Sequence, residues 1–159
     1  MDITKIENIV KGHPFFKGME KEYVNELVGC ATNAQFKPGE NIFHHAEQAN
    51  HFYIITAGRV AVEIESADRG AITIQTVEPG SVLGWSWLFP PYVWHYDARS
   101  TEATDTIAFD ARCLVGKCES NPALGYDLMK RFSGVLTERL QATHLQLMDM
   151  YGTSKKPVA

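Results

Sequence analysis

Short runs of β-branched and aromatic residues alternate with turn sequences at intervals of about ten residues between positions 35 and 110. Val60, Val62 and Ile64 alternate with polar or small neighbours, as expected for a half-buried strand. Regularly spaced short strands of this kind predict a sandwich, a barrel or a jelly roll. The turns are Lys37-Pro38-Gly39, Ala57-Gly58, Asp68-Arg69-Gly70 and Glu78-Pro79-Gly80, and the strands expected around them are 51–58, 59–66, 70–80, 98–105 and 106–110.

Helical patterns flank this β region on both sides. Residues 20–30 carry an apolar helical face, and His13-Pro14 breaks the chain before it. The second pattern starts at Asn121-Pro122, a helix cap followed by proline, and keeps spacings of three, four and seven to about residue 150. At 1.5 Å per residue, this helix of about 28 residues is roughly 42 Å long. It is longer than a domain of this size needs for its own packing.

Composition limits the class of protein. The chain has 159 residues, with 45% hydrophobic and 21% charged, which are the proportions of one ordinary globular domain. The net charge is −4 and the basic residues are scattered, so we expect no nucleic-acid partner. The sequence has no run of about 18 apolar residues and no N-terminal signal pattern, so we expect a cytoplasmic protein without membrane attachment.

The three cysteines are Cys30, Cys113 and Cys118. They form no CxxC pair and lack the spacing of a four-ligand zinc site. We therefore expect three buried, reduced thiols, as is usual in a cytoplasmic protein.

The order of these parts and several short motifs resemble the cyclic-nucleotide-binding domain of the CRP/FNR and kinase-regulatory type. The resemblance covers about Phe15 to Tyr151 and implies a mainly β fold with flanking helices. It is an eight-stranded antiparallel β-roll, jelly-roll-like, with N-terminal helices and a long C-terminal helix. We expect one domain at 1–151, divided into helices at 1–33, the β-roll at 34–110 and C-terminal helices at 111–151, and a disordered tail at 152–159. The motifs are Pro38-Gly39-Glu40, Phe52-Tyr53-Ile54-Ile55, Gly58-Arg59-Val60 and Pro79-Gly80-Ser81-Val82-Leu83-Gly84.

The resemblance fails at the two charged anchors of the ligand. In the family, the segment after Gly84 is a phosphate-binding cassette, in which a glutamate holds the ribose hydroxyl and an arginine pairs with the cyclic phosphate. Trp85 stands at the position of the glutamate and Tyr96 at that of the arginine. Losing two charge-assisted contacts weakens binding by roughly two to four decades. Arg99 is expected to point to the opposite face of the strand from Tyr96. Cyclic AMP bound in the usual way is therefore not expected, and the cofactor is unknown, with a cyclic nucleotide still possible.

The segment GWSWLFPPYVWHY, residues 84–96, holds all three tryptophans of the chain. One interpretation is a remodelled ligand pocket, lined by flat apolar rings with indole and phenol donors. The alternative is that the tryptophans fill the pocket themselves. On the first interpretation the ligand-binding residues are Gly84, Trp85, Ser86, Trp87, Trp94, Tyr96, Asp97 and Ala98, with Thr143 and His144 of the long helix as a lid.

A cupin-like metal-dependent enzyme is a second possibility, because Gly39, His44, His45, Glu47, His51 and Gly58 superficially echo a cupin metal motif. No second-half motif with its own histidine follows, although His95 could be imagined in that role. His44 and His45 are adjacent, however, so on a strand they point to opposite faces and cannot hold one ion. The chain also lacks a GxSxG elbow and a phosphate-loop motif. We expect no metal site and no enzymatic activity.

The function expected is that of a stand-alone regulatory module that senses a ligand. Only eight residues follow Tyr151, too few for a helix-turn-helix, so we expect regulation through another protein. The long helix, 122–150, is expected to form a homodimer, because Leu136, Leu140, Leu147 and Met150 lie on its distal half. A dimeric interaction scaffold without any ligand is a further alternative.

Overall fold

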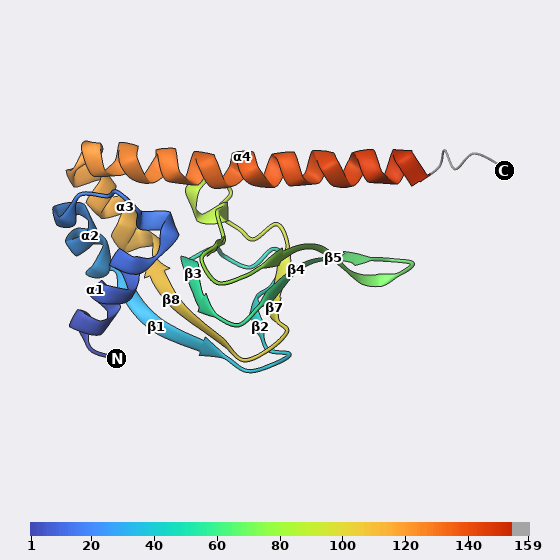
Figure 1. The fold of residues 1–159 in the computed structure, drawn as a ribbon, viewed down its shortest axis with the longest axis horizontal. Coiled ribbons are helices and arrows are strands. Elements are labelled where there is room, and N and C mark those ends of the chain that lie inside the picture. The colour runs from blue at the N-terminus through green and yellow to red at the C-terminus, as the bar shows by residue number, and fades with distance from the viewer. Residues whose placement is uncertain (154–159) are drawn as a thin grey trace.

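A computed structural model describes residues 1–153 and shows a β-roll flanked by helices (Figure 1). This confirms the fold class expected from the sequence. Helices α1 (Ile3–Gly12) and α2 (Lys21–Val28) lie at one end of the roll together with α3 (Ala111–Ser120), and the short 3-10 turn η1 (Pro14–Phe16) joins the first two. Helix α4 (Pro122–Thr153) starts at this end and runs along the whole roll and beyond it. No helix in this part of the chain is long and apolar enough to cross a membrane.

The roll consists of two four-stranded antiparallel sheets. The first has the order β1-β8-β3-β6, with β1 at Ala31–Phe36, β8 at Thr104–Asp110, β3 at His51–Ala57 and β6 at Val82–Leu83. The second has the order β2-β7-β4-β5, with β2 at Asn41–Phe43, β7 at Asp97–Ser100, β4 at Val60–Ser66 and β5 at Gly70–Val77.

Phe132 of α4 is the central contact between the long helix and the roll. Its ring is almost fully buried, and its centroid lies 5.1 Å from that of Phe15, 5.0 Å from that of Phe52 and 5.5 Å from that of Trp87. These rings belong to the N-terminal turn η1, to β3 and to the loop after β6. One side chain therefore joins four parts of the chain in a single apolar core.

The predicted strand boundaries are wrong at the last hairpin. The sequence suggested strands at 98–105 and 106–110, but the structure has a turn at 101–103, between β7 and β8. The Ser100 hydroxyl donates a hydrogen bond to Thr104 Oγ1 at 2.8 Å, which ties the two ends of this turn together. Ser100 and Thr104, which the sequence suggested to be within one strand, therefore lie on either side of the turn and hold it closed.

The structure also moves two of the expected boundaries, the start of the β-roll and the end of the C-terminal helices. Strand β1 begins at Ala31 rather than at 34, because Ala31 pairs with Phe109 of β8. The expected helix cap is present, since Asn121 Oδ1 accepts a hydrogen bond from the Leu124 amide at 3.3 Å. Helix α4 continues to Thr153, so the first two residues of the expected tail are helical, and residues 154–159 lie outside the described part of the chain.

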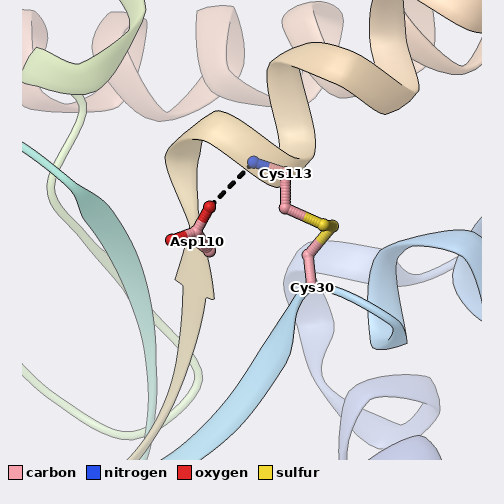
Figure 2. The surroundings of a disulfide bond; sticks show 3 residues. All are labelled: Cys30, Asp110 and Cys113. Carbon is pink, nitrogen blue, oxygen red and sulfur yellow. Dashed lines mark hydrogen bonds between the residues drawn. A yellow bond between two sulfur atoms is a disulfide. The ribbon is translucent and has the colours of Figure 1, made fainter.

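Cys30 and Cys113 form a disulfide bond, so the expectation of three reduced thiols is wrong for this pair (Figure 2). The two residues are 83 positions apart in sequence, but the pairing of β1 with β8 brings their Cα atoms to 5.6 Å. This is an ordinary Cα separation for a disulfide. Asp110 Oδ1 caps α3 by accepting a hydrogen bond from the Cys113 amide at 2.8 Å. The bond therefore links the start of β1 to the first turn of α3, while Cys118 stays free.

Replacing Cys30 with serine should lower the free energy of unfolding by about 2–4 kcal/mol, because the unfolded chain loses a cross-link that closes a long loop. Urea unfolding of the oxidised proteins measures this difference. It should vanish when both proteins are kept in dithiothreitol, and Cys118→Ser should match the wild type in either condition. A wild type whose stability does not depend on dithiothreitol would contradict the assignment.

Candidate functional site

A cavity of about 960 Å³ lies between the inner face of the second sheet, the loop after β6 and helix α4. This volume is within the range of small-molecule sites. The strands contribute apolar side chains, among them Phe43, Val62, Ile64 and Ile74. The loop contributes Gly84, Trp85, Ser86, Trp94, His95 and Tyr96, and α4 contributes Val135, Leu136, Arg139, Leu140 and Thr143, with further residues from both.

The loop after β6 depends on a close contact between Gly84 and Trp94. Gly84 has φ +95°, and a Cβ there would lie 2.8 Å from the Trp94 ring, so only glycine fits. Phe43 of β2 stacks on the Trp94 ring, with centroids 3.7 Å apart and planes 8° from parallel. These contacts with Gly84 and Phe43 fix Trp94 at the far end of the aromatic loop.

Trp87 is a core residue. It lies in the 3-10 turn η2 (Ser86–Leu88), is 3% exposed, and stacks on Phe52 at 5.7 Å in addition to its contact with Phe132. Its indole Nε1 is buried and has no hydrogen-bond partner among the described residues. Trp87 does not line the cavity. The core-filling interpretation therefore holds for Trp87. It holds in part for Trp94, which is 4% exposed but still lines the cavity.

Trp85 is different, because it is only half-buried and lines the cavity. Its ring stacks on His95, with centroids 5.1 Å apart and planes at 22°. The Nδ1 atom of His95 is 3.0 Å from the Ser86 hydroxyl oxygen, and Tyr96 lines the cavity next to it. These four side chains form the loop wall of the cavity.

The two charged residues near Tyr96 are engaged outside the cavity. Asp97 Oδ1 accepts a hydrogen bond from the His45 amide at 2.7 Å. The Arg99 guanidinium donates two hydrogen bonds to Glu63, at 2.9 and 3.2 Å, and these bonds raise the pKa of Arg99. Neither side chain lines the cavity. Arg99 therefore does not take the place of the arginine that is missing at Tyr96.

The remaining candidates divide between buried and exposed positions. Ala98 is fully buried and pairs with Val62 of β4, but it does not itself line the cavity. Thr143 lines the cavity, and its hydroxyl donates to the Arg139 carbonyl oxygen at 2.9 Å. His144 is exposed and does not line it.

Arg139 is one of the cavity residues that the sequence analysis did not select. Its Nη2 donates a hydrogen bond to the Val82 carbonyl oxygen of β6, so the side chain crosses from the helix to the roll. Burial lowers the pKa of Arg139 to about 10. The sequence does contain a signal for it, because Arg139 follows the buried Phe132 by seven residues, which is about two helical turns on the same face.

Within residues 1–153, no three His, Cys, Asp or Glu side chains are placed to hold a metal ion. Of the histidines that suggested a cupin site, His44 lies beside Asp97, with 3.9 Å between Nδ1 and Oδ1, and His95 belongs to the loop wall.

Comparison with known proteins now identifies the family. The model of the cyclic nucleotide-binding domain matches residues 34–121. The chain belongs to this family. A CRP-like cAMP-activated global transcriptional regulator of Mycobacterium tuberculosis is 22% identical over 148 residues, covering 93% of this chain and 64% of the regulator. The chain therefore spans less than two thirds of that curated relative.

Two solved structures have the same fold. One is a putative cyclic nucleotide-binding protein from Geobacter metallireducens, with a TM-score of 0.74 and 24% identity over 88% of this chain and 98% of its own. The other is a cyclic nucleotide-binding domain from Methylobacillus flagellatus, with a TM-score of 0.78 and 18% identity over 93% of this chain and 83% of its own. The cavity of this chain is therefore built on the fold that these two structures share.

The three tryptophans should differ sharply in a quenching experiment. Single Trp→Phe variants at 85, 87 and 94 remove one indole each, and acrylamide quenching of the remaining fluorescence measures what was lost. Trp85→Phe should remove most of the quenchable emission, because Trp87 and Trp94 are 3% and 4% exposed.

Trp87→Ala should lower the free energy of unfolding by about 3–5 kcal/mol, as for other buried aromatic residues, whereas Trp85→Ala should lower it clearly less. Equal costs at the two positions would make Trp85 a core residue.

Proposed function

We propose that this chain is a ligand-sensing regulatory module of the cyclic nucleotide-binding domain family whose ligand is not cyclic AMP held in the usual way. The observation that carries the proposal is a cavity of about 960 Å³ lined by both the aromatic loop and α4. Trp85 and Tyr96, which replace the two charged anchors, both line it. The tryptophans did not fill this space, which favours the pocket interpretation over a ligand-free scaffold.

Sensing requires that a ligand favour one arrangement of the protein over another. A molecule in this cavity contacts the β-roll on one side and α4 on the other, so its binding energy depends on how the helix sits on the roll. The loop wall also faces the ligand, but its loop is anchored at Gly84, Trp87 and Trp94. The position of α4 is thus the output that we assign to ligand binding.

The wider role follows from the relatives. The Mycobacterium tuberculosis relative is a transcriptional regulator, so we propose a non-catalytic, regulatory role in the cytoplasm for this chain as well. An effect through a protein partner, rather than through direct contact with nucleic acid, fits the net charge of −4.

We also propose that α4 pairs with the α4 helix of a second copy. Leu136, Leu140, Thr143 and Leu147 follow each other at steps of four, three and four residues, the spacing of a coiled-coil seam. Leu140 is 57% exposed and Leu147 is 49% exposed. A second helix with the same stripe would cover this seam and give a two-fold interface.

Leu147→Glu should convert the dimer to a monomer, because it places a carboxylate in an apolar seam. Sedimentation equilibrium or light scattering measures the change. Leu145→Glu is the matched control: Leu145 is also exposed, at 63%, but lies off the seam, so this variant should remain dimeric. A wild type that is monomeric at high micromolar concentration would refute the dimer.

Thermal melts with cyclic AMP and cyclic GMP at millimolar concentration test the ligand assignment. We expect shifts of less than one degree or so, because both charged anchors are replaced. Binding at a hundred times the dissociation constant would add about 2.7 kcal/mol and raise the melting temperature by several degrees. A shift of that size, lost in Tyr96→Ala, would show that the pocket binds cyclic nucleotides through a rebuilt site.

A further inference from the structure

Arg139 carries a positive charge into the cavity without an acidic partner. Two arginines line the cavity, and Arg131 already has an acidic partner: it pairs with Asp127 at 2.7 Å and donates to the Phe15 and Lys17 carbonyl oxygens, both at 2.8 Å. Arg139 makes one hydrogen bond, and no carboxylate among residues 1–153 forms an ion pair with it. A guanidinium has five N–H donors, so most of those of Arg139 remain available.

The environment makes this charge costly to leave alone. A cation withdrawn from water without a counter-charge is unfavourable, and burial lowers the pKa of Arg139 to about 10. The group is still protonated at neutral pH. An anion that reached it would recover part of the lost solvation and would form charge-assisted hydrogen bonds.

The rest of the cavity is suited to an apolar molecule. Its strand wall carries Phe43, Val62, Ile64 and Ile74 beside the polar Gln75 and Thr76, and its loop wall carries the flat rings of Trp85 and Tyr96. Among the described lining residues, Glu138 is the single acidic side chain, and it is exposed at the rim. No acidic group is therefore available inside to hold sugar hydroxyls.

We propose that the cavity binds a small, flat, mostly apolar molecule with one anionic group, a carboxylate in particular, and that Arg139 pairs with this group. The proposal rests on the proposed function and names the chemical class of its ligand. Arg139 belongs to α4 and not to the β-roll. An anionic ligand that lies against the roll therefore also forms an ion pair with the helix. The aromatic part of the ligand is held by Trp85 and Tyr96.

Two fluorescent probes with the same ring system test the proposal. 8-Anilinonaphthalene-1-sulfonate carries one anionic group, and N-phenyl-1-naphthylamine is its neutral counterpart. The purified wild-type protein should bind the sulfonate about ten- to a hundredfold more tightly than the neutral probe, which is the value of one charge-assisted contact. A weaker affinity for both probes in Trp85→Ala, which removes an aromatic face of the loop wall, locates the binding in the cavity. 2-Naphthoate should displace the sulfonate, and 2-naphthol should do so much less well.

Three variants isolate the charge. Arg139→Gln should remove the preference for the sulfonate over the neutral probe, whereas Arg139→Lys should keep part of this preference. Glu138→Gln should increase the sulfonate affinity about two- to fivefold, because it removes a carboxylate whose negative charge repels the sulfonate. Glu138 is exposed, so this variant tests the electrostatics even if substitution of Arg139 impairs folding.

The pH dependence has a definite sign. The preference for the sulfonate should be constant around neutral pH, where Arg139 keeps its proton, and can weaken only at alkaline pH, because burial lowers the pKa of Arg139 to about 10. Equal binding of both probes by the wild type, or an unchanged preference in Arg139→Gln, would overturn the role of Arg139 and leave the cavity as a ligand site. Binding of neither probe would instead count against the proposed function itself, and with it against this inference.

Discussion

The insertion of Phe132 between Phe15, Phe52 and Trp87 fixes where the long helix lies, and the site depends on that position. Helix α4 buries Leu124, Leu128 and Phe132, but every residue from 140 to 150 is exposed. The distal half is therefore positioned by contacts made in its first turns. The hydrogen bonds of Arg131 to the chain around η1 add a rotational constraint. With the helix held in this way, Arg139, two turns beyond Phe132, can only face the roll.

The aromatic loop divides its large side chains between the core and the cavity. Trp87 and Trp94 are anchored in the core and against β2, and this anchoring holds the loop open beside them instead of letting it collapse into the cavity. Trp85 is then presented to the cavity with His95 behind it. A loop with fewer anchored aromatics would be free to fill the space that it now encloses.

Much of the fold was predictable, because turn residues and hydrophobic alternation are local properties of the sequence. The roles of the three tryptophans were not, since a loop has no periodicity from which to infer which ring faces the core. The Cys30–Cys113 bond was missed for a related reason: the two residues meet only through the register of β1 on β8. The last hairpin was misplaced because its turn, residues 101–103, contains no glycine or proline to mark it. Arg139 could have been found, as a charged residue that continues the stripe of Leu128 and Phe132.

Helix α4 also has the mechanics of a lever arm. Fourteen residues follow Arg139, about 21 Å of helix, so a tilt of roughly 5° at that point would move the last turn by about 2 Å. Gly134 lies between the anchored turns and Arg139, and a Cβ there would meet nothing within 4 Å. Space does not require glycine at this position, and glycine is the residue that makes a helix easiest to bend. A bend near Gly134 that moves Arg139 at the cavity would therefore move the C-terminal end of α4 further than Arg139 itself.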